Sequence, residues 1–215
     1  MINNKYEVET ARVYSKIYHD RYKYHPSQTR FTKKLIIKNL KQSNIKLNDF
    51  KKMNALNIGT GVEAVVLNDL GAKKTYHFDL SNRAVKNLKK ISKNKKYRNI
   101  YSNRKNIVKE KIKIKEKIDF VFLQGVIHHF NNVENGLKNI IENINLKGKI
   151  FLRIYKSGAI SYFYVDFIRK FLNLKSTKLF DLIFKKRFKV VTNSSGQVRR
   201  DFITYLYNHC IDNIF

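Results

Sequence analysis

The fold is constrained most by a repeated alternation of short apolar runs with amphipathic segments between residues 54 and 155. Five runs have the length and composition of strands, and they cover residues 54–58, 74–80, 98–102, 117–123 and 149–155. The segment that begins at Val133 repeats apolar residues at offsets of 4, 7, 8 and 11, which is the spacing of one helix face. Strands that alternate with helices in this way predict an α/β fold with a doubly wound, mostly parallel sheet.

Local signals place the ends of the predicted helices. Gly71 is expected to end a helix over residues 62–70, and Ser81 is expected to cap the next one. Asn131 or Asn132 has the same role for the helix that begins at Val133. These signals divide the central part of the chain into strand–helix units.

The segments on either side of this alternation predict helices. A helix before residue 50 is expected to bury Phe31, Leu35, Ile36 and Leu40, and helical spacing recurs over residues 160–172. We therefore expect an N-terminal helical cap over 1–50, a core over 51–155 and a C-terminal helical extension over 156–215. The helix over 160–172 is expected either to pack on the sheet or to lie on an anionic membrane surface.

The end of the sheet is less well defined than its centre. Residues 188–192 and 202–207 are the remaining strand candidates, and the second also fits a helix. The sheet is therefore expected to be trimmed, or to be completed by residues beyond 215. An open edge would favour association with a partner chain and hence an oligomer.

The formal net charge of +29 identifies a strongly basic protein. Residues 86–117 carry fourteen lysines or arginines against two glutamates, and residues 169–200 carry ten against Asp181. Such a charge attracts nucleic acid, anionic lipid or acidic substrates. A chain rich in Lys, Asn, Ile, Phe and Tyr also reflects AT-rich codons, so both explanations stay open at this point.

Other features narrow the class of protein. Cys210 is the single cysteine, so neither an internal disulfide framework nor a Cys/His metal site is expected. No apolar run approaches the roughly 20 residues that a membrane-spanning helix needs. We expect a cytoplasmic protein that binds no metal and is at most peripherally associated with membranes.

The turn Gly59-Thr60-Gly61 lies between the first predicted strand and the following helix. Glycines there let the backbone bend and approach a ligand, and the helix offers unpaired N–H groups. Asp79 ends the next strand, where its carboxylate can accept both hydroxyls of a ribose. A nicotinamide dinucleotide and S-adenosylmethionine both fit this arrangement, and a sharp turn with a solvated Asp79 is the alternative without a ligand.

The segment after the fourth strand separates these ligands. It contains Asp119-Phe120-Val121, then Val126-Ile127-His128-His129, and then Leu146-Lys147-Gly148 before the fifth strand. In this order the blocks resemble the corresponding part of class I S-adenosylmethionine-dependent methyltransferases, over about residues 54–155. The resemblance implies a Rossmann-like fold, S-adenosyl-L-methionine as cofactor and S-adenosyl-L-homocysteine as product.

The resemblance also implies roles for individual residues. The expected cofactor-binding residues are Asn57, Gly59, Thr60, Gly61, Asp79, Leu80, Ser102, Asn103, Gln124 and Gly125. The chain departs from the family pattern at Asn57, where an acidic residue is usual, and at Glu63 or Ala64, where a third glycine is frequent. An acidic residue near the adenine is also missing, which puts the cofactor's affinity in doubt.

Methyl transfer from a sulfonium depends mainly on alignment, and a base is needed only if the acceptor must lose a proton. His128 and His129 are the candidate catalytic bases, with capping or packing of the next helix as the alternative role. Tyr14, Tyr18 and Tyr22 are expected to contact the substrate or to form a lid, or else to pack the cap on the core.

The sequence as a whole favours a methyltransferase with a small-molecule acceptor. A nucleic-acid methyltransferase is the first alternative, although no Asn-Pro-Pro-Tyr tetrapeptide follows the fourth strand. A catalytically idle nucleic-acid-binding module that keeps the fold is the second. A nicotinamide-dependent oxidoreductase is the third.

Overall fold

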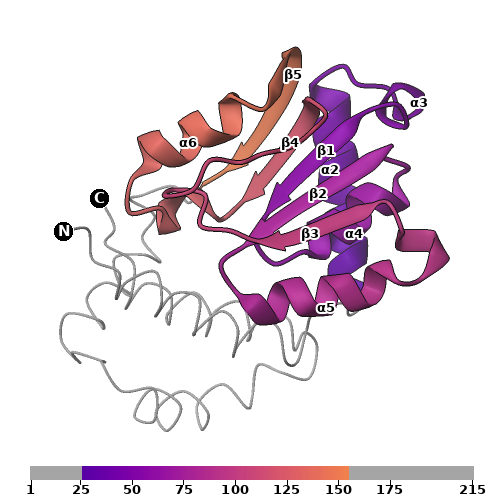
Figure 1. Ribbon diagram of the computed structural model, residues 1–215. Coiled ribbons are helices and arrows are strands. Elements are labelled where there is room, and N and C mark those ends of the chain that lie inside the picture. The colour runs from indigo at the N-terminus through magenta and orange to yellow at the C-terminus, as the bar shows by residue number, and fades with distance from the viewer. Residues whose placement is uncertain (1–25, 155–215) are drawn as a thin grey trace, which may run out of the picture. The chain divides into compact units, whose positions relative to one another are not determined.

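The computed structural model describes residues 26–154, which form a five-stranded parallel sheet between helices (Figure 1). The strands lie in the order β3-β2-β1-β4-β5. Their bounds are β1 (Asn54–Ile58), β2 (Lys74–Asp79), β3 (Ile100–Arg104), β4 (Ile118–Gln124) and β5 (Ile144–Arg153). The predicted α/β fold is thus confirmed, while Tyr14, Tyr18, Tyr22 and all predicted elements after residue 155 lie outside the described residues.

The helical elements are α2 (Pro26–Gln42), α3 (Leu47–Phe50), α4 (Val62–Asp69), α5 (Asn82–Ser92), η1 (Lys95–Tyr97), η2 (Ile127–His129) and α6 (Val133–Ile141). The predicted caps are confirmed. The Ser81 hydroxyl accepts a hydrogen bond from the backbone N–H of Ala84, and Asn132 accepts one from Asn135. Gly71 follows α4 with a φ of +94°, the left-handed conformation that commonly ends helices.

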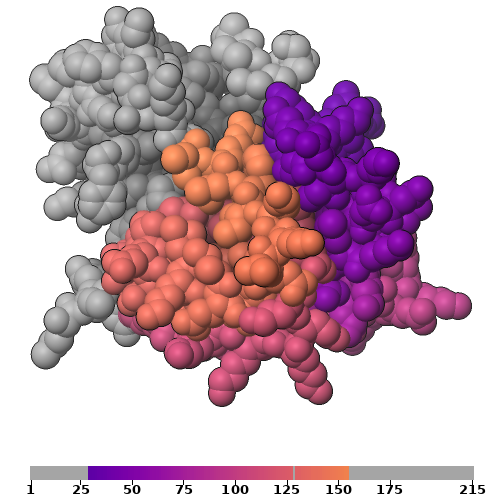
Figure 2. All heavy atoms as spheres, turned by 90° about the horizontal axis from the view of Figure 1, so that it is seen from above, coloured from indigo at the N-terminus to yellow at the C-terminus, as the bar shows by residue number. Residues whose placement is uncertain are grey.

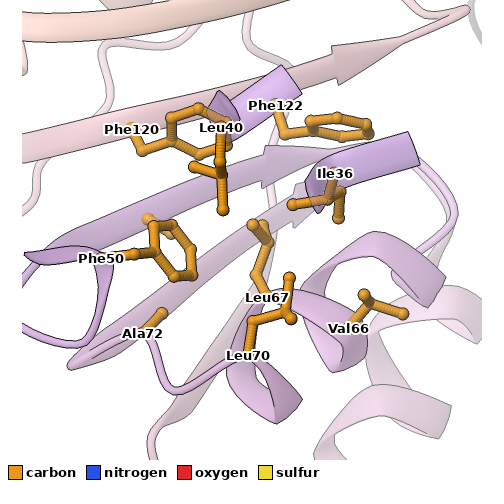
Figure 3. Close-up of a cluster of buried hydrophobic side chains, with 10 residues drawn as sticks. Ile36, Leu40, Phe50, Val66, Leu67, Leu70, Ala72, Phe120 and Phe122 are labelled. Atoms are coloured by element: carbon orange, nitrogen blue, oxygen red, sulfur yellow. The ribbon is translucent and has the colours of Figure 1, made fainter. Parts of the chain in front are cut away.

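One face of the sheet is covered by α2, α3 and α4. Ile36 and Leu40 of α2 share a buried cluster with Phe120 and Phe122 of β4 (Figure 3). Phe151 of β5 packs against this cluster, and Figure 2 shows the indigo surface of α2 next to the orange surface of β5. The prediction that Phe31 is buried is wrong, because its side chain is 54% exposed on the outer side of α2.

The direction of α2 follows from the same cluster. Leu40 lies beside Phe120, and Ile36 lies beside Phe122, which is closer to the carboxyl end of β4 (Figure 3). The helix therefore runs antiparallel to β4, and its first residues point toward the carboxyl edge of the sheet.

The opposite face carries a second apolar cluster. Ile107 and Ile112, from the connection between β3 and β4, pack there with Val121 of β4 and Ile140 of α6. A smaller cluster joins Leu88 of α5 to Ala64, Val65 and Ile100 on the α4 side of the sheet. Both faces of β1 and β4 are buried, which explains why these strands are apolar almost throughout.

The fifth strand begins earlier than expected. Ile118 pairs with Ile144, but Phe120 pairs with Lys149, so the chain of β5 bulges between these two points. Residues 145–148, which precede the strand predicted over 149–155, form this bulge. A Cβ on Gly148 would overlap the side chain of Ile144, which explains the glycine at this position.

Within residues 26–154, no helix is both long and apolar enough to cross a membrane. The same residues contain no group of three or more His, Cys, Asp or Glu side chains arranged to hold a metal ion.

Candidate functional site

The turn after β1 approaches the turn after β4. Gly59 and Gly61 have φ values of +122° and +85°, which L-residues with a side chain rarely adopt. A Cβ on Gly59 would lie 3.0 Å from the Cγ2 atom of Val126, in the turn that follows β4. The glycines therefore serve both the bend and the close approach of the two strand ends.

A row of buried polar side chains lies directly behind this turn. Asn57, His77 and Ser102 occupy aligned positions on β1, β2 and β3, and the side chains of all three are at least 96% buried. Nε2 of His77 lies 2.7 Å from the carbonyl oxygen of Gly59, and Nδ1 lies 2.8 Å from the hydroxyl oxygen of Ser102. The row links the third strand of the sheet to the glycine turn.

Two members of the site have amide oxygens that are buried without a hydrogen-bond partner among the described residues. They are Oδ1 of Asn57 and Oε1 of Gln124. Asn57 pairs in register with Phe122, so Gln124 lies two residues further along β4 on the same face. An unsatisfied buried acceptor costs about 1–3 kcal/mol. Asn39, Asn54 and Thr75 also have buried polar atoms without a partner, so it is their place beside the glycine turn that distinguishes the oxygens of Asn57 and Gln124.

Asp79 ends β2 at the same edge of the sheet. Its Oδ1 accepts a hydrogen bond of 2.5 Å from the backbone N–H of Ser81, which orients the carboxylate over the start of α5. Leu80 follows it and is half-buried, and the Leu80 carbonyl accepts a hydrogen bond of 3.0 Å from Nε of Arg104. The ribose-binding position predicted for Asp79 is therefore flanked by an arginine from β3.

Glu63 introduces a carboxyl group into the first turn of α4. Its side chain is buried, and Oε2 accepts a hydrogen bond of 3.0 Å from the Thr60 hydroxyl. Burial raises the pKa of the Glu63 carboxyl above its ordinary value, against the lowering effect of these hydrogen bonds. Thr60, predicted to bind the cofactor, is thus tied to Glu63 within the glycine turn.

The turn after β4 contains the two candidate bases. Gly125 has a φ of +62°, and its N–H donates to the carbonyl of Arg153 on β5. His129 is half-buried at the end of η2, with its backbone N–H bonded to Val126. His128 lies in η2 as well, but its side chain is outside the described part of the structure.

The structure brings most of the predicted residues together at the carboxyl edge of the sheet, along β1, β2 and β4. Two residues of β3 differ from the expectation. The side chain of Ser102 faces inward to His77, and Asn103 is exposed on the opposite face. Sequence reasoning missed His77 and the burial of Glu63, because a histidine inside a strand and a glutamate in a first helical turn carry no distinctive signal.

The comparisons agree with this geometry. Residues 56–152 match a family described as "Methyltransferase domain". A search of curated protein sequences gave no significant match.

Solved structures with the same fold include the DhpI-SAM-HEP complex, with 12% identity, a TM-score of 0.52, and coverage of 80% of this chain and 71% of that chain. The MccD protein has 15% identity, a TM-score of 0.52, and coverage of 73% and 69%. PKMT2 from Rickettsia typhi in complex with AdoHcy has 17% identity, a TM-score of 0.51, and coverage of 74% of this chain and 32% of that chain.

The fold and the strand-end turn define a Rossmann-like domain of the methyltransferase type. The part of the chain that matches the methyltransferase-domain family is residues 56–152, which include the glycine turn, Asp79 and the turn after β4.

Proposed function

We propose that the protein transfers a methyl group from S-adenosyl-L-methionine to a small-molecule acceptor. The proposal is carried by the two unpartnered amide oxygens of Asn57 and Gln124, which lie at the strand ends beside the glycine turn. The family assignment of residues 56–152 supports the same reaction class.

The described residues fit the cofactor's chemistry. The ammonium group of its methionine part supplies several N–H donors, and Asn57 and Gln124 offer buried acceptors without a proton to lose. The Asp79 carboxylate would accept the ribose hydroxyls, and Gly59 and Gly61 would leave room for the ligand against the backbone. When bound, the cofactor supplies an activated methyl group on a sulfonium.

The chain has Asn57 where an acidic residue is usual, and the amides of Asn57 and Gln124 would take over part of its contact with the cofactor. A neutral amide accepts a hydrogen bond from an ammonium group but adds no opposite charge, so it holds the ligand less strongly than a carboxylate. The neutral amides of Asn57 and Gln124 would therefore bind the ammonium group of the cofactor, and the charged carboxylate of Asp79 would bind its ribose.

Calorimetric titration with S-adenosylmethionine and S-adenosylhomocysteine tests cofactor binding, with NAD as a control ligand. Asp79→Ala is expected to weaken binding at least about tenfold, because a charge-assisted hydrogen bond is lost. Asp49→Ala, at an exposed position of α3, removes the same charge away from the site and should leave affinity unchanged. Absence of binding to both sulfur ligands by folded protein would overturn the proposal.

Asn57→Leu tests whether the unpartnered amide oxygen of Asn57 contributes to cofactor binding. Oδ1 of Asn57 has no partner among the described residues, and Nδ2 donates only long hydrogen bonds of 3.4 Å to the carbonyls of Ile58 and Phe122. An apolar side chain of similar shape should therefore cost little stability. Cofactor affinity should nevertheless fall severalfold. Equal affinity in the variant and the parent protein would contradict the role of the amide.

The proposed class of acceptor is based on the turn after β4. Its sequence is Gln124-Gly125-Val126-Ile127, and it lacks the Asn-Pro-Pro-Tyr tetrapeptide that is typical of enzymes that methylate amino groups of nucleobases. His128 or His129 would take a proton from the acceptor, and Tyr14, Tyr18 and Tyr22 are proposed to close over it. Incubation of a cell extract with methyl-labelled cofactor should put the label in the small-molecule fraction. Label in RNA or protein would overturn the acceptor assignment.

The role of the catalytic base is tested by comparing the variants His128→Gln and His129→Gln in the same labelling assay.

A further inference from the structure

The positive charge of the chain is distributed unevenly along the described residues. Residues 86–117 hold fourteen lysines or arginines and two glutamates, whereas the next 32 residues, 118–149, hold three lysines and three acidic residues. A general preference for lysine codons would raise the charge of both segments alike. The contrast therefore calls for a local explanation.

The basic segment surrounds β3, which lies at one edge of the sheet. On one face of β3, α5 and η1 pack through Leu88 and Tyr97. The connection between β3 and β4 crosses the other face of the sheet (Figure 1), where Ile107 and Ile112 pack with Phe78 of β2 and Val121 of β4. We name the exposed residues around this strand the β3-edge surface: Lys86, Lys89, Lys90, Lys93, Lys95, Arg98, Tyr101, Asn103, Arg104, Lys111, Lys113 and Lys115.

The acidic residues near this surface are used within the protein. Glu116 forms an ion pair with Lys74 and a hydrogen bond with Tyr76, and Glu110 accepts a hydrogen bond from the backbone of Asn106. Asp69 pairs with Lys96. Glu116 and Asp69 are thus paired with lysines that are not part of the β3-edge surface, and Glu110 is the acidic residue that remains beside it.

Lysines alternate with inward-facing residues along the connection. Lys111, Lys113 and Lys115 are exposed, whereas Ile112 is buried and Ile114 is half-buried. In an extended chain, alternate residues are about 6.5–7 Å apart on the same side. A row of cations at this spacing suits a chain of regularly repeated anions.

The aromatic and apolar content of the surface distinguishes a nucleic acid from a membrane. Tyr101 is 44% exposed and stacks on Tyr76 with a centroid distance of 5.5 Å. The large aliphatic side chains exposed among the described residues, such as Leu47, Ile141 and Leu146, belong to other elements. Amphipathic surfaces that bind membranes combine basic residues with apolar side chains that insert, whereas surfaces with basic residues and aromatic rings bind single strands by charge and stacking.

We propose that the β3-edge surface binds single-stranded nucleic acid, through phosphate contacts from its lysines and stacking on Tyr101. This binding does not depend on methyl transfer, so it can be confirmed or refuted whether or not the protein has the proposed enzymatic activity. Because phosphate contacts carry no base information, the surface binds with little sequence preference.

Fluorescence anisotropy with a labelled RNA of about 15 nucleotides and mixed sequence tests the proposal on the full chain. Binding should be measurable at about 50 mM salt and should weaken steeply as salt rises, with a slope of about −0.7 for each phosphate contact. A variant with glutamine at Lys86, Lys90, Lys93, Lys111, Lys113 and Lys115 should bind at least about tenfold more weakly, with a shallower slope.

The matched control carries glutamine at six exposed lysines outside this surface, at Lys33, Lys34, Lys38, Lys41, Lys46 and Lys52. It removes the same total charge and should keep more than half of the affinity. Both variants should retain the unfolding midpoint of the parent protein, because the substituted side chains are exposed. Equal losses in the two variants would overturn the proposal, as would absence of RNA binding at low salt. Binding to vesicles that contain phosphatidylserine without binding to RNA would overturn it in favour of a membrane.

Discussion

Nε2 of His77 lies 2.7 Å from the carbonyl oxygen of Gly59, so a side chain of β2 holds the first peptide of the glycine turn after β1. The carbonyl can only accept, and Nε2 therefore carries the proton of this hydrogen bond. Ser102 on β3 contacts the other ring nitrogen. The turn is thus positioned by two neighbouring strands in addition to its own.

Replacement of His77 by Phe should weaken cofactor binding and lower the free energy of unfolding by about 1–3 kcal/mol, because buried partners lose their hydrogen bonds. Ser102→Ala should cost about 1 kcal/mol and reduce affinity less. Calorimetry and urea unfolding provide the two measurements. Leu40→Ala, which destabilises the core away from the turn, is the control and should leave affinity unchanged in folded protein. Equal affinities in His77→Phe and this control would limit His77 to a structural role.

Alanine at Gly61 should abolish cofactor binding. The residue has a φ of +85°, and its Cβ would lie 3.3 Å from Nε2 of His77 and from Cδ2 of Leu88. The left-handed conformation alone costs about 1–2 kcal/mol. Gly71→Ala is a matched control, since φ is +94° and its Cβ would meet the flexible side chain of Lys51. Thermal unfolding should show a loss in both variants, and titration should show lost binding only at Gly61.

The buried carboxyl of Glu63 makes stability depend on pH. Its pKa in the folded protein is raised by burial, so the folded state binds more protons than the unfolded state once the pH exceeds the unfolded pKa. Stability therefore falls as pH rises from the unfolded pKa toward the folded one. Glu63→Gln keeps an acceptor for Thr60 and removes this penalty. Unfolding temperatures of the two proteins should agree near pH 4 and separate toward pH 8, with the variant more stable; a gap that narrows with pH would contradict the assignment.

The helix α2 should unfold together with the sheet, because Leu40 is 1% exposed and shares the cluster of Phe120. Leu40→Ala should cost about 2–5 kcal/mol. Leu47→Ala, at a side chain that is 43% exposed, should stay within about 0.5 kcal/mol of the parent protein. Urea denaturation measures both. A separate early transition in Leu40→Ala would show that residues before 50 form a cap that unfolds alone.

The α/β fold with a mostly parallel sheet could be predicted, since β1 and β4 are buried on both faces and their sequences are largely apolar. Helix ends were predictable at Ser81 and Asn132 because a side-chain cap is a local interaction. The start of β5 was not, because the bulge before Lys149 depends on pairing with β4. The exposure of Phe31 likewise depends on how α2 lies on the sheet.

In the site, too, local features could be predicted from the sequence, whereas contacts between distant segments could not. The glycines and Asp79 could be found from the sequence because their conformations and spacing are local features. The contact between His77 and Gly59 joins residues of different strands, and the orphaned oxygens of Asn57 and Gln124 become visible only when the neighbours of each atom are known. The inward orientation of Ser102 follows from its register opposite His77.

The position of β3 at the edge of the sheet has a consequence for contacts between copies of the chain. An edge strand is a template onto which another strand can add, and proteins protect such edges with charged side chains. Two copies that approached along β3 would bring two dense sets of lysines against each other. Electrostatic repulsion therefore opposes self-association at this edge, and added salt, which screens that repulsion, would weaken the protection.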